Sequence, residues 1–233
     1  MPIAIVNNQD HSNLRVRPPA DFKFLSDVHM LPLVLQECGH AGNEYPVVFT
    51  KQEGSRRLQL VAVFSLSAGR NPFVTEGMWH GLYLPAIVQN LPFKLVNDMQ
   101  DSSQLVLGMD TASELVSESE GERLFDDAGD ETEYLQRVKE SLGTYYEHDR
   151  ITQAAIEVLE ELDLLVEAQL TVKVGDRSVG VNGVYTTDIV KLKELDDDKF
   201  NDLRDKDILP LLYAQIFSIN QFHRLARYES LNG

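Results

Sequence analysis

The chain has 233 residues, 43% hydrophobic and 25% charged, a composition typical of a globular protein with a substantial core. Its 37 acidic and 21 basic residues give a net charge of −16, which disfavours nucleic-acid binding and adsorption to an anionic membrane surface. The single cysteine, Cys38, excludes an intramolecular disulfide. Without a signal peptide or an apolar run long enough to span a bilayer, we expect no membrane insertion and a cytoplasmic location.

The N-terminal part, about 1–109, is predicted to be rich in β-structure. Residues 1–30 are expected to form an irregular arm, because Pro18 and Pro19 break any helix and the following "DFKFLSDVHMLPLVL" has no clear period. A short helix is expected over 33–40, ending at a glycine. Two β-rich runs, "YPVVFTKQ" and "LQLVAVFSLS", flank a turn-like "EGSRR" and predict an antiparallel hairpin.

The segment 71–93, "NPFVTEGMWHGLYLPAIVQNLPF", concentrates proline and aromatic residues and contains the only tryptophan of the chain. Pro85 and Pro92 prevent one continuous helix, so a single helical turn is expected over 86–91. A strand is expected in "SQLVLGMD", which follows. The segment could therefore be a folding corner, a pocket wall or a surface that contacts a partner.

An acidic connection is expected over about 110–133. Its dense carboxylates are interrupted by the apolar pairs Leu115-Val116 and Leu124-Phe125, so we expect a solvated connection held at these two points. "DDAGDETE" resembles an EF-hand in composition but lacks its ligand spacing, which leaves only weak surface binding of Ca²⁺. The paired carboxylates favour solvated faces over acid–base pairs, because a raised carboxyl pKa requires burial.

The C-terminal part, about 134–233, is predicted to contain four helices and one hairpin. Apolar periodicity indicates a helix in "ETEYLQRVKESLGTYYEH" and a second helix in "DRITQAAIEVLEELDLLVEA", with Asp149 or Thr152 as its N-cap. Alternating residues around Gly175-Asp176 predict the hairpin. Helices are then expected in "DIVKLKELDDDKFNDLRD" and "ILPLLYAQIFSINQFHRLARYE". The last is expected to align five apolar residues on one face: Leu212, Ile216, Ile219, Phe222 and Leu225.

The order of these elements predicts an α+β fold, with antiparallel hairpins packed as a sheet against C-terminal helices. Several local patterns, in the same order, are similar to those of a known family. They are "YPVVF" at 45–49, the 71–93 segment, "ERLFDDAGDET" at 122–132, and "VNGVYTTD" followed by "LPLLYAQIFSINQFHRL". Together they resemble the SapC family of bacterial proteins over nearly the whole chain, from about Tyr45 to Leu225.

This resemblance implies a single SapC-like domain over 1–233. The family takes its name from an association with surface-layer proteins, and its members are often encoded near outer-membrane receptors, flavin-dependent halogenase-like enzymes and cupin-like oxygenases. That context suggests uptake or modification of peptides or small molecules. Members commonly have a basic residue and a Tyr before the Pro-Phe pair. Here Gln89, Asn90 and Leu91 stand instead, which argues against anion binding by that position.

The sequence contains no H-E-x-x-H, G-x-S-x-G, P-loop or dinucleotide-binding motif, so we expect no catalytic residues, cofactor or dedicated metal site. Glu37, Cys38, His40 and Glu44 could offer two metal ligands, or mark a helix C-terminus, where histidine is favoured. The second interpretation is preferred. Cys38 is expected to pack as a small apolar residue.

The candidate binding residues lie mostly in the 71–93 segment. They are Asn71, Phe73, Trp79, His80, Tyr83, Pro85, Phe93, His223 and Arg224. Trp79, Tyr83 and Phe93 offer large contact areas, and the prolines reduce the entropy lost on binding. These aromatics could instead fill the joint between the N-terminal sheet and the C-terminal helices. In the last helix, Gln215 and Asn220 could, with His223 and Arg224, line a cleft or mark a solvent face.

The function predicted from these features is that of a binding or accessory protein that engages a peptide, a small molecule or a protein partner. An enzyme with an unrecognised active site near His80, His223 or Arg224 is the first alternative. A structural component of a surface layer is the second, and the missing export signal argues against it. The oligomeric state is left open.

Overall fold

The computed structural model describes residues 3–52, 54–98, 101 and 104–232. The chain forms two compact units, and each draws on two separate stretches of sequence. The first unit comprises Met1–Ala20 and Ala86–Glu147, and the second comprises Asp21–Pro85 and His148–Gly233. Both units therefore use residues from before and after the acidic stretch.

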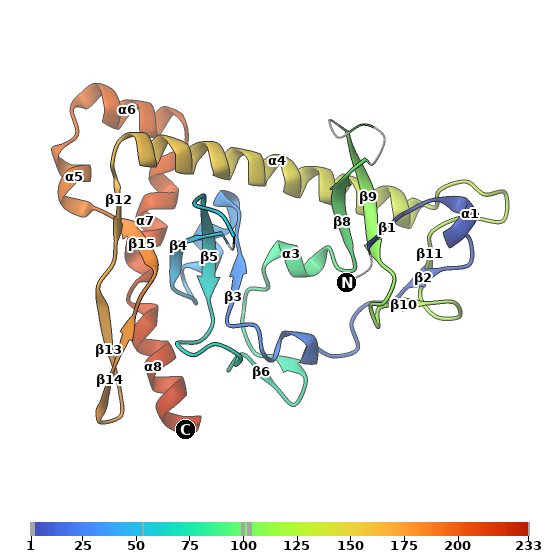
Figure 1. Ribbon diagram of the computed structural model, residues 1–233, viewed down its shortest axis with the longest axis horizontal. Coiled ribbons are helices and arrows are strands. Elements are labelled where there is room, and N and C mark those ends of the chain that lie inside the picture. The colour runs from blue at the N-terminus through green and yellow to red at the C-terminus, as the bar shows by residue number, and fades with distance from the viewer. Residues whose placement is uncertain (1–2, 53, 99–100, 102–103, 233) are drawn as a thin grey trace. The chain divides into compact units, whose positions relative to one another are not determined.

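The first unit contains two three-stranded antiparallel sheets and the first half of a long helix (Figure 1). One sheet has the order β1-β9-β8, with β1 at Ile3–Ile5, β8 at Phe93–Asn97 and β9 at Leu105–Asp110. The other has the order β10-β2-β11, with β2 at Arg15–Val16, β10 at Val116–Ser117 and β11 at Glu122–Arg123. Its short helices are α1 (Asn8–His11) and α3 (Ala86–Gln89).

The apolar residues of the acidic stretch complete the core of the first unit. Leu115, Leu124 and Phe125 are buried together with Phe93 and Met109 of the larger sheet. On either side of them, β10 and β11 both pair with β2, so carboxylates face solvent while the chain is held at two points. These apolar residues therefore hold the acidic stretch, which lies within the first unit.

The second unit is built around a five-stranded antiparallel sheet of order β12-β15-β4-β5-β3. These strands are β3 (Met30–Pro32), β4 (Val47–Lys51), β5 (Leu58–Val63), β12 (Leu165–Glu167) and β15 (Val184–Thr187). Val47, Val48 and Phe49 are all buried, as expected for a central strand covered on both faces. The predicted pairing of β4 with β5 is confirmed, with Phe49 opposite Leu60.

Two further hairpins belong to the second unit. In the first, β13 (Leu170–Val174) pairs with β14 (Arg177–Val181) across the predicted Gly175-Asp176 turn. Gly175 has a φ of 59°, which a two-residue turn of this kind requires. In the second, β6 (Val74–Thr75) pairs with β7 (Met78–Trp79).

Several helices also belong to the second unit. They are η1 (Lys23–Leu25), η2 (Leu35–Glu37), α2 (Cys38–Ala41), α5 (Ile189–Glu194), α6 (Asp197–Asp205), α7 (Ile208–Ser218) and α8 (Gln221–Asn232), with the second half of α4 (Glu133–Glu161). Figure 1 shows α7 alongside β4 and β15. The buried Gln215 of α7 links both strands: it accepts from Thr187 N at 3.1 Å and donates to Val47 O at 3.3 Å. Ser218 adds a second link by accepting from Val47 N at 2.9 Å.

The fold class expected from the sequence is confirmed: the protein is mixed α+β, and its strands pair in an antiparallel manner. The prediction of two helices between 131 and 168 was wrong, because α4 is a single helix from Glu133 to Glu161 that crosses the predicted break. No proline interrupts it, and Gly143 lies within it. Thr152 is not an N-cap: its hydroxyl donates to His148 O at 2.7 Å and accepts from Leu35 N at 2.8 Å.

The two helices predicted after residue 187 also differ from the structure, because each divides into two. The carboxylate of Asp196 accepts from Lys199 N at 2.9 Å and starts α6 as an N-cap, which ends the preceding helix. The second break falls at Ile219 and Asn220, between α7 and α8. The apolar face predicted to run from Leu212 to Leu225 is therefore shared by two helices.

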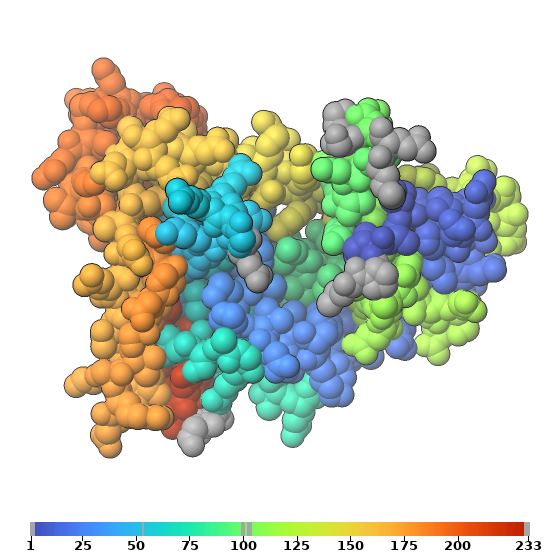
Figure 2. Space-filling view, viewed as in Figure 1, coloured from blue at the N-terminus to red at the C-terminus, as the bar shows by residue number. Residues whose placement is uncertain are grey.

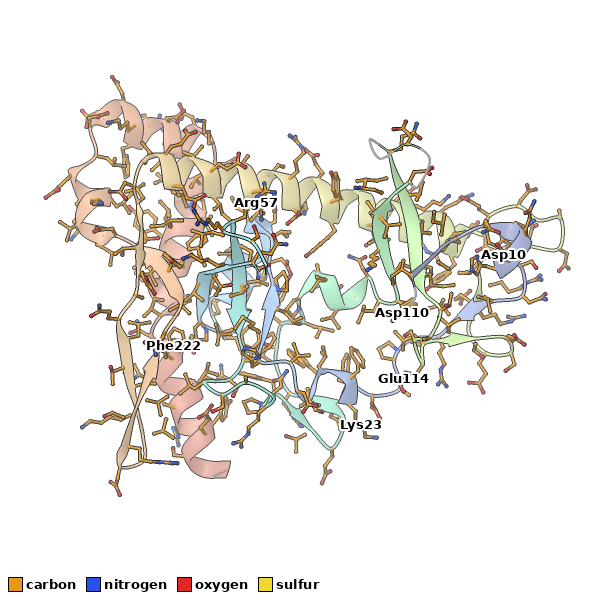
Figure 3. All side chains as sticks on the ribbon, in the orientation of Figure 1. Asp10, Lys23, Arg57, Asp110, Glu114 and Phe222 are labelled. Carbon is orange, nitrogen blue, oxygen red and sulfur yellow. The ribbon has the colours of Figure 1, made fainter. Side chains whose placement is uncertain are left out.

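Across the described residues, the helices are too short or too polar to cross a lipid bilayer. An ion pair ties the second half of α4 to the rest of the second unit. Figure 3 labels Arg57, in the connection between β4 and β5, beside this helix. Its Nη2 lies 3.2 Å from the Glu157 carboxylate of α4.

Candidate functional site

The predicted binding segment begins at two anchors in the core of the second unit. Asn71 is buried, donates from Nδ2 to Leu25 O at 3.1 Å and accepts from Phe73 N at 3.0 Å. Phe73 is also buried. Both residues therefore fix the start of the segment and have little surface to offer a ligand.

Four aromatic rings form a cluster beneath this segment. Tyr45 contacts Phe64 and Phe73 with ring centroids 4.9 Å apart in each pair and nearly perpendicular planes. Trp79 lies 5.5 Å from Phe64, again edge to face. Such geometry adds stabilisation beyond burial of area. Trp79 is only partly buried, so the cluster reaches the surface.

A tight turn directs the side chains of β6 and β7. Glu76 and Gly77 have φ values of 54° and 80°, and the two positive values match a two-residue hairpin turn. Gly77 O accepts from Phe22 N at 2.7 Å, which holds the turn. The period of two along β7 then leaves Met78 exposed and turns Trp79 towards the aromatic cluster. In Figure 2 the residues around β6 and β7 reach the molecular surface.

The backbone after β7 is fixed by a buried carboxylate. The Glu44 side chain is 4% exposed, and its Oε2 accepts from Leu82 N at 2.6 Å and from Tyr83 N at 3.0 Å. Beside it, the Tyr45 hydroxyl donates to Tyr83 O at 2.7 Å. Burial, followed by the Glu44 carboxylate, raises the pKa of Tyr45, so this hydroxyl keeps its proton and remains a donor. We call residues 78–83 the 78–83 loop.

The side chain of Tyr83 adds a further bond that fixes the loop. Its hydroxyl donates to Glu37 Oε1 at 2.6 Å, and Glu37 Oε2 accepts from Val34 N at 2.9 Å. The ring of His40 stacks against Tyr83 at 5.7 Å. The residues weighed as metal ligands, Glu37, His40 and Glu44, therefore act as supports of the loop. Over the part of the chain that is described, no group of three potential ligands could hold a metal ion.

Gly81 allows the loop to pack closely against the cluster. A Cβ at this position would lie 2.0 Å from the Tyr45 hydroxyl and 2.7 Å from Trp79 Nε1. Only glycine fits without a shift of these side chains. Within the described ranges, the buried Trp79 Nε1 has no hydrogen-bond partner.

Arg224 supports the same site from α8. Its guanidinium lies over the rings of Phe73 and Tyr228, at 5.8 and 5.4 Å, and its Nη2 is 3.6 Å from Glu44 Oε1. His223, its neighbour in the sequence, is exposed, as is Asn220, whereas Gln215 is buried between strands. The structure thus joins Arg224 to the predicted segment and places His223 at the surface.

The remaining candidates have different positions. His80 is exposed, and its backbone N donates to Phe73 O at 2.8 Å. Pro85 is buried at the end of the second unit, whereas Phe93 is buried in the core of the first. Phe93 therefore belongs to a different cluster from Trp79.

The most exposed apolar side chains of the loop were not among the predicted residues. Leu82 is 97% exposed and Met78 is 64% exposed. Glu44, Tyr45 and Gly81 were also missed as supports. The sequence signal for Gly81 was its place between Trp79 and Tyr83, but the partner it packs against, Tyr45, is distant in the chain.

Cys38 is buried in the second unit. Burial raises the pKa of its thiol, with a smaller contribution from Glu37. The thiolate, which is the reactive form, is therefore strongly disfavoured. In the first unit, Asp126 Oδ1 accepts hydrogen bonds from Ala128 N and Asp130 N, both at 2.9 Å. The Asp126 side chain therefore stabilises the turn in which it lies.

These observations define a mixed α+β protein with an aromatic loop fixed to the surface of its second unit. The SapC family model matches residues 6–225, so the chain belongs to the SapC family, and the prediction from the sequence motifs is confirmed. Comparisons with curated proteins and with solved structures gave no match.

Proposed function

We propose that this SapC family protein is a soluble, cytoplasmic binding or accessory protein that engages a peptide segment of a partner protein through its 78–83 loop. The observation that carries the proposal is the exposure of Leu82 on a backbone fixed by buried groups. Its own N–H and that of Tyr83 both bond to the buried Glu44 carboxylate. Because its backbone is fixed, this leucine keeps its apolar side chain in water, where it is available to a partner.

The fixed backbone supports binding because little conformational freedom remains to be lost. Loops that are rigid before association avoid part of the entropy cost of ordering side chains and backbone. Met78 adds a flexible apolar side chain that adapts to different surfaces. The partner segment is therefore expected to present apolar side chains to Leu82 and Met78.

Charge narrows the class of partner. The chain carries a net charge of −16, which repels acidic peptides and favours neutral or basic ones. The exposed polar groups at this site include His80 of the loop and His40 beside it. We therefore expect an apolar, non-acidic segment as the bound element.

Trp79 provides the assay, because it is the only tryptophan of the chain and is a partly buried residue of the loop itself. Peptides selected from a random display library are titrated against the protein while Trp79 emission is recorded. We expect apolar, non-acidic sequences whose Kd rises about tenfold or more with Leu82→Ala, the size expected for a central contact residue.

The matched control is Val190→Ala on α5, another apolar residue that is 64% exposed. It should leave the Kd unchanged. If selected peptides bind Leu82→Ala as tightly as the parent protein, the loop is not the binding site. Native mass spectrometry of the protein from its host then identifies the natural partner, which must show the same dependence on Leu82.

A further inference from the structure

A separate cavity lies in the first unit, between the end of α3 and the first turns of α4. Its volume is about 280 Å³, close to the lower limit for small-molecule sites. It is lined by Gln89, Asn90, Leu91, Phe93, Tyr134, Arg137, Val138 and Ser141. The cavity shares no lining residue with the 78–83 loop, so its role is argued independently.

One side of this cavity is apolar and largely aromatic. Phe93 and Tyr134 have ring centroids 6.4 Å apart, with planes inclined at 57°. The exposed Leu91 and the half-buried Val138 extend the apolar surface. These walls suit a flat ring or a branched aliphatic group of about the size of an amino-acid side chain.

The polar side is held in place by a bond between the two elements. Ser141 Oγ donates to Asn90 Oδ1 at 2.8 Å, and Asn90 Nδ2 donates to Ala86 O at 3.2 Å. Asn90 is buried. Its amide is therefore a fixed polar group at the wall of the cavity.

Arg137 of α4 supplies the positive charge that Gln89, Asn90 and Leu91 themselves lack. It is the one charged side chain among the lining residues, and within the described part of the chain it forms no ion pair. Its positive charge acts on the Tyr134 hydroxyl, against the larger effect of burial, which raises the pKa of that group. Arg137 is exposed, so it is available to an incoming anion.

Acidic groups oppose an anion here but do not line the site. Glu133 and Glu140 lie one turn to either side of Arg137 on α4, and the whole chain is acidic. Since one helical turn is shorter than the screening length of about 8 Å, these carboxylates lower the affinity for an anion, and the charge of Glu122 also acts on Tyr134. The Arg137 guanidinium offsets this repulsion by binding a carboxylate directly through two parallel hydrogen bonds.

We propose that this cavity binds a small organic carboxylate with an apolar ring or branched chain. The carboxylate pairs with the Arg137 guanidinium, and the apolar part lies against Phe93, Tyr134 and Val138. The ligand is comparable in size to an amino acid. This inference extends the proposed function by adding a small-molecule site to the first unit.

Phenylacetate is the probe, and phenethylamine, which has the same ring and a positive charge, is the matched ligand. Binding is measured by calorimetry and by chemical-shift changes at residues 134–141. We expect phenylacetate to bind at least about tenfold more tightly than phenethylamine, and Arg137→Gln to weaken phenylacetate about tenfold or more. Arg56→Gln, at an exposed site in the second unit, removes the same charge and should have no effect.

Val138→Phe provides a second variant, because it keeps Arg137 but fills the cavity, and it should also weaken phenylacetate. Equal affinity for the two probes, no binding of phenylacetate at millimolar concentration, or an unchanged Kd in Arg137→Gln would each overturn the proposal. Leu82→Ala should leave phenylacetate binding intact, and Arg137→Gln should leave peptide binding intact. Failure of one site is thereby distinguished from failure of the other.

Discussion

Replacing Tyr45 by phenylalanine tests whether the 78–83 loop is fixed as described. Tyr45 is fully buried, and its hydroxyl donates to Tyr83 O at 2.7 Å. The ring contacts with Phe64 and Phe73 persist in the variant, because the ring itself is retained. The loss is therefore one buried hydrogen bond, and the free energy of unfolding should fall by about 1–3 kcal/mol.

The position of Gly81 sharpens this prediction into a double-mutant cycle. In Gly81→Ala the new Cβ would lie 2.0 Å from the Tyr45 hydroxyl, and we expect a cost of about 1–3 kcal/mol from overpacking. Tyr45→Phe removes the atom in closest conflict. The double variant should therefore be more stable than the sum of the single changes predicts, with a coupling energy of about 0.5–3 kcal/mol.

Unfolding in urea, followed by circular dichroism and Trp79 emission, measures these free energies. Tyr146→Phe is the control: this tyrosine is exposed on α4, and its change should stay within about 0.5 kcal/mol. A negligible cost for Tyr45→Phe, or strictly additive costs in the cycle, would refute the proposed packing of Tyr45 against Gly81.

Three further outcomes are expected. Thr152→Val should lower the free energy of unfolding by about 1–3 kcal/mol, since Leu35 N loses its acceptor. Thr152→Ser keeps the hydroxyl and should preserve the stability. Equal stability of the two variants would contradict the role of this hydrogen bond. Cys38 should react with a thiol reagent on the order of a hundredfold faster in denaturant than in the native protein, and equal rates would show that the thiol is accessible. Burial raises the pKa of Asp149, and the positive charge of Arg57 opposes this effect only in part. The folded state therefore binds the proton more tightly than the unfolded state. The free energy of unfolding falls as the pH rises from about 4 through the pKa of the folded state. Asp149→Asn should therefore be more stable than the parent protein at neutral pH and equally stable below about pH 3. Urea titrations across this pH range measure both differences. A variant that is less stable than the parent at neutral pH would contradict the prediction.

Local sequence rules predicted the elements that close within a few residues. Gly175-Asp176 and the alternating residues around it determined the β13–β14 hairpin, and β4 and β5 pair as expected. The apolar pairs at Leu115 and Leu124 were recognised because apolar residues that interrupt an acidic stretch are expected to be buried in a core. In contrast, β8 was missed, because its residues are recognisable as a strand only from their pairing with β9 and because Phe93 lies directly after a proline.

The supports of the candidate site could not be predicted because they are distant in sequence. Glu44 and Leu82 are separated by 38 residues, as are Tyr45 and Tyr83. No periodicity in the sequence links such pairs, and the sequence does not distinguish a buried carboxylate from an exposed one. The aromatic content of the segment was visible, but the exposure of Leu82 follows only from the way the backbone is fixed.

The division of each unit between two stretches of the chain has a consequence for synthesis. The apolar strands β4 and β5 leave the ribosome early, yet α7, which packs against β4, is made more than a hundred residues later. The first unit, complete at Glu147, can fold while these strands still lack their cover. We therefore expect the nascent chain to depend on a chaperone during this interval, and truncated chains that end near residue 150 to aggregate.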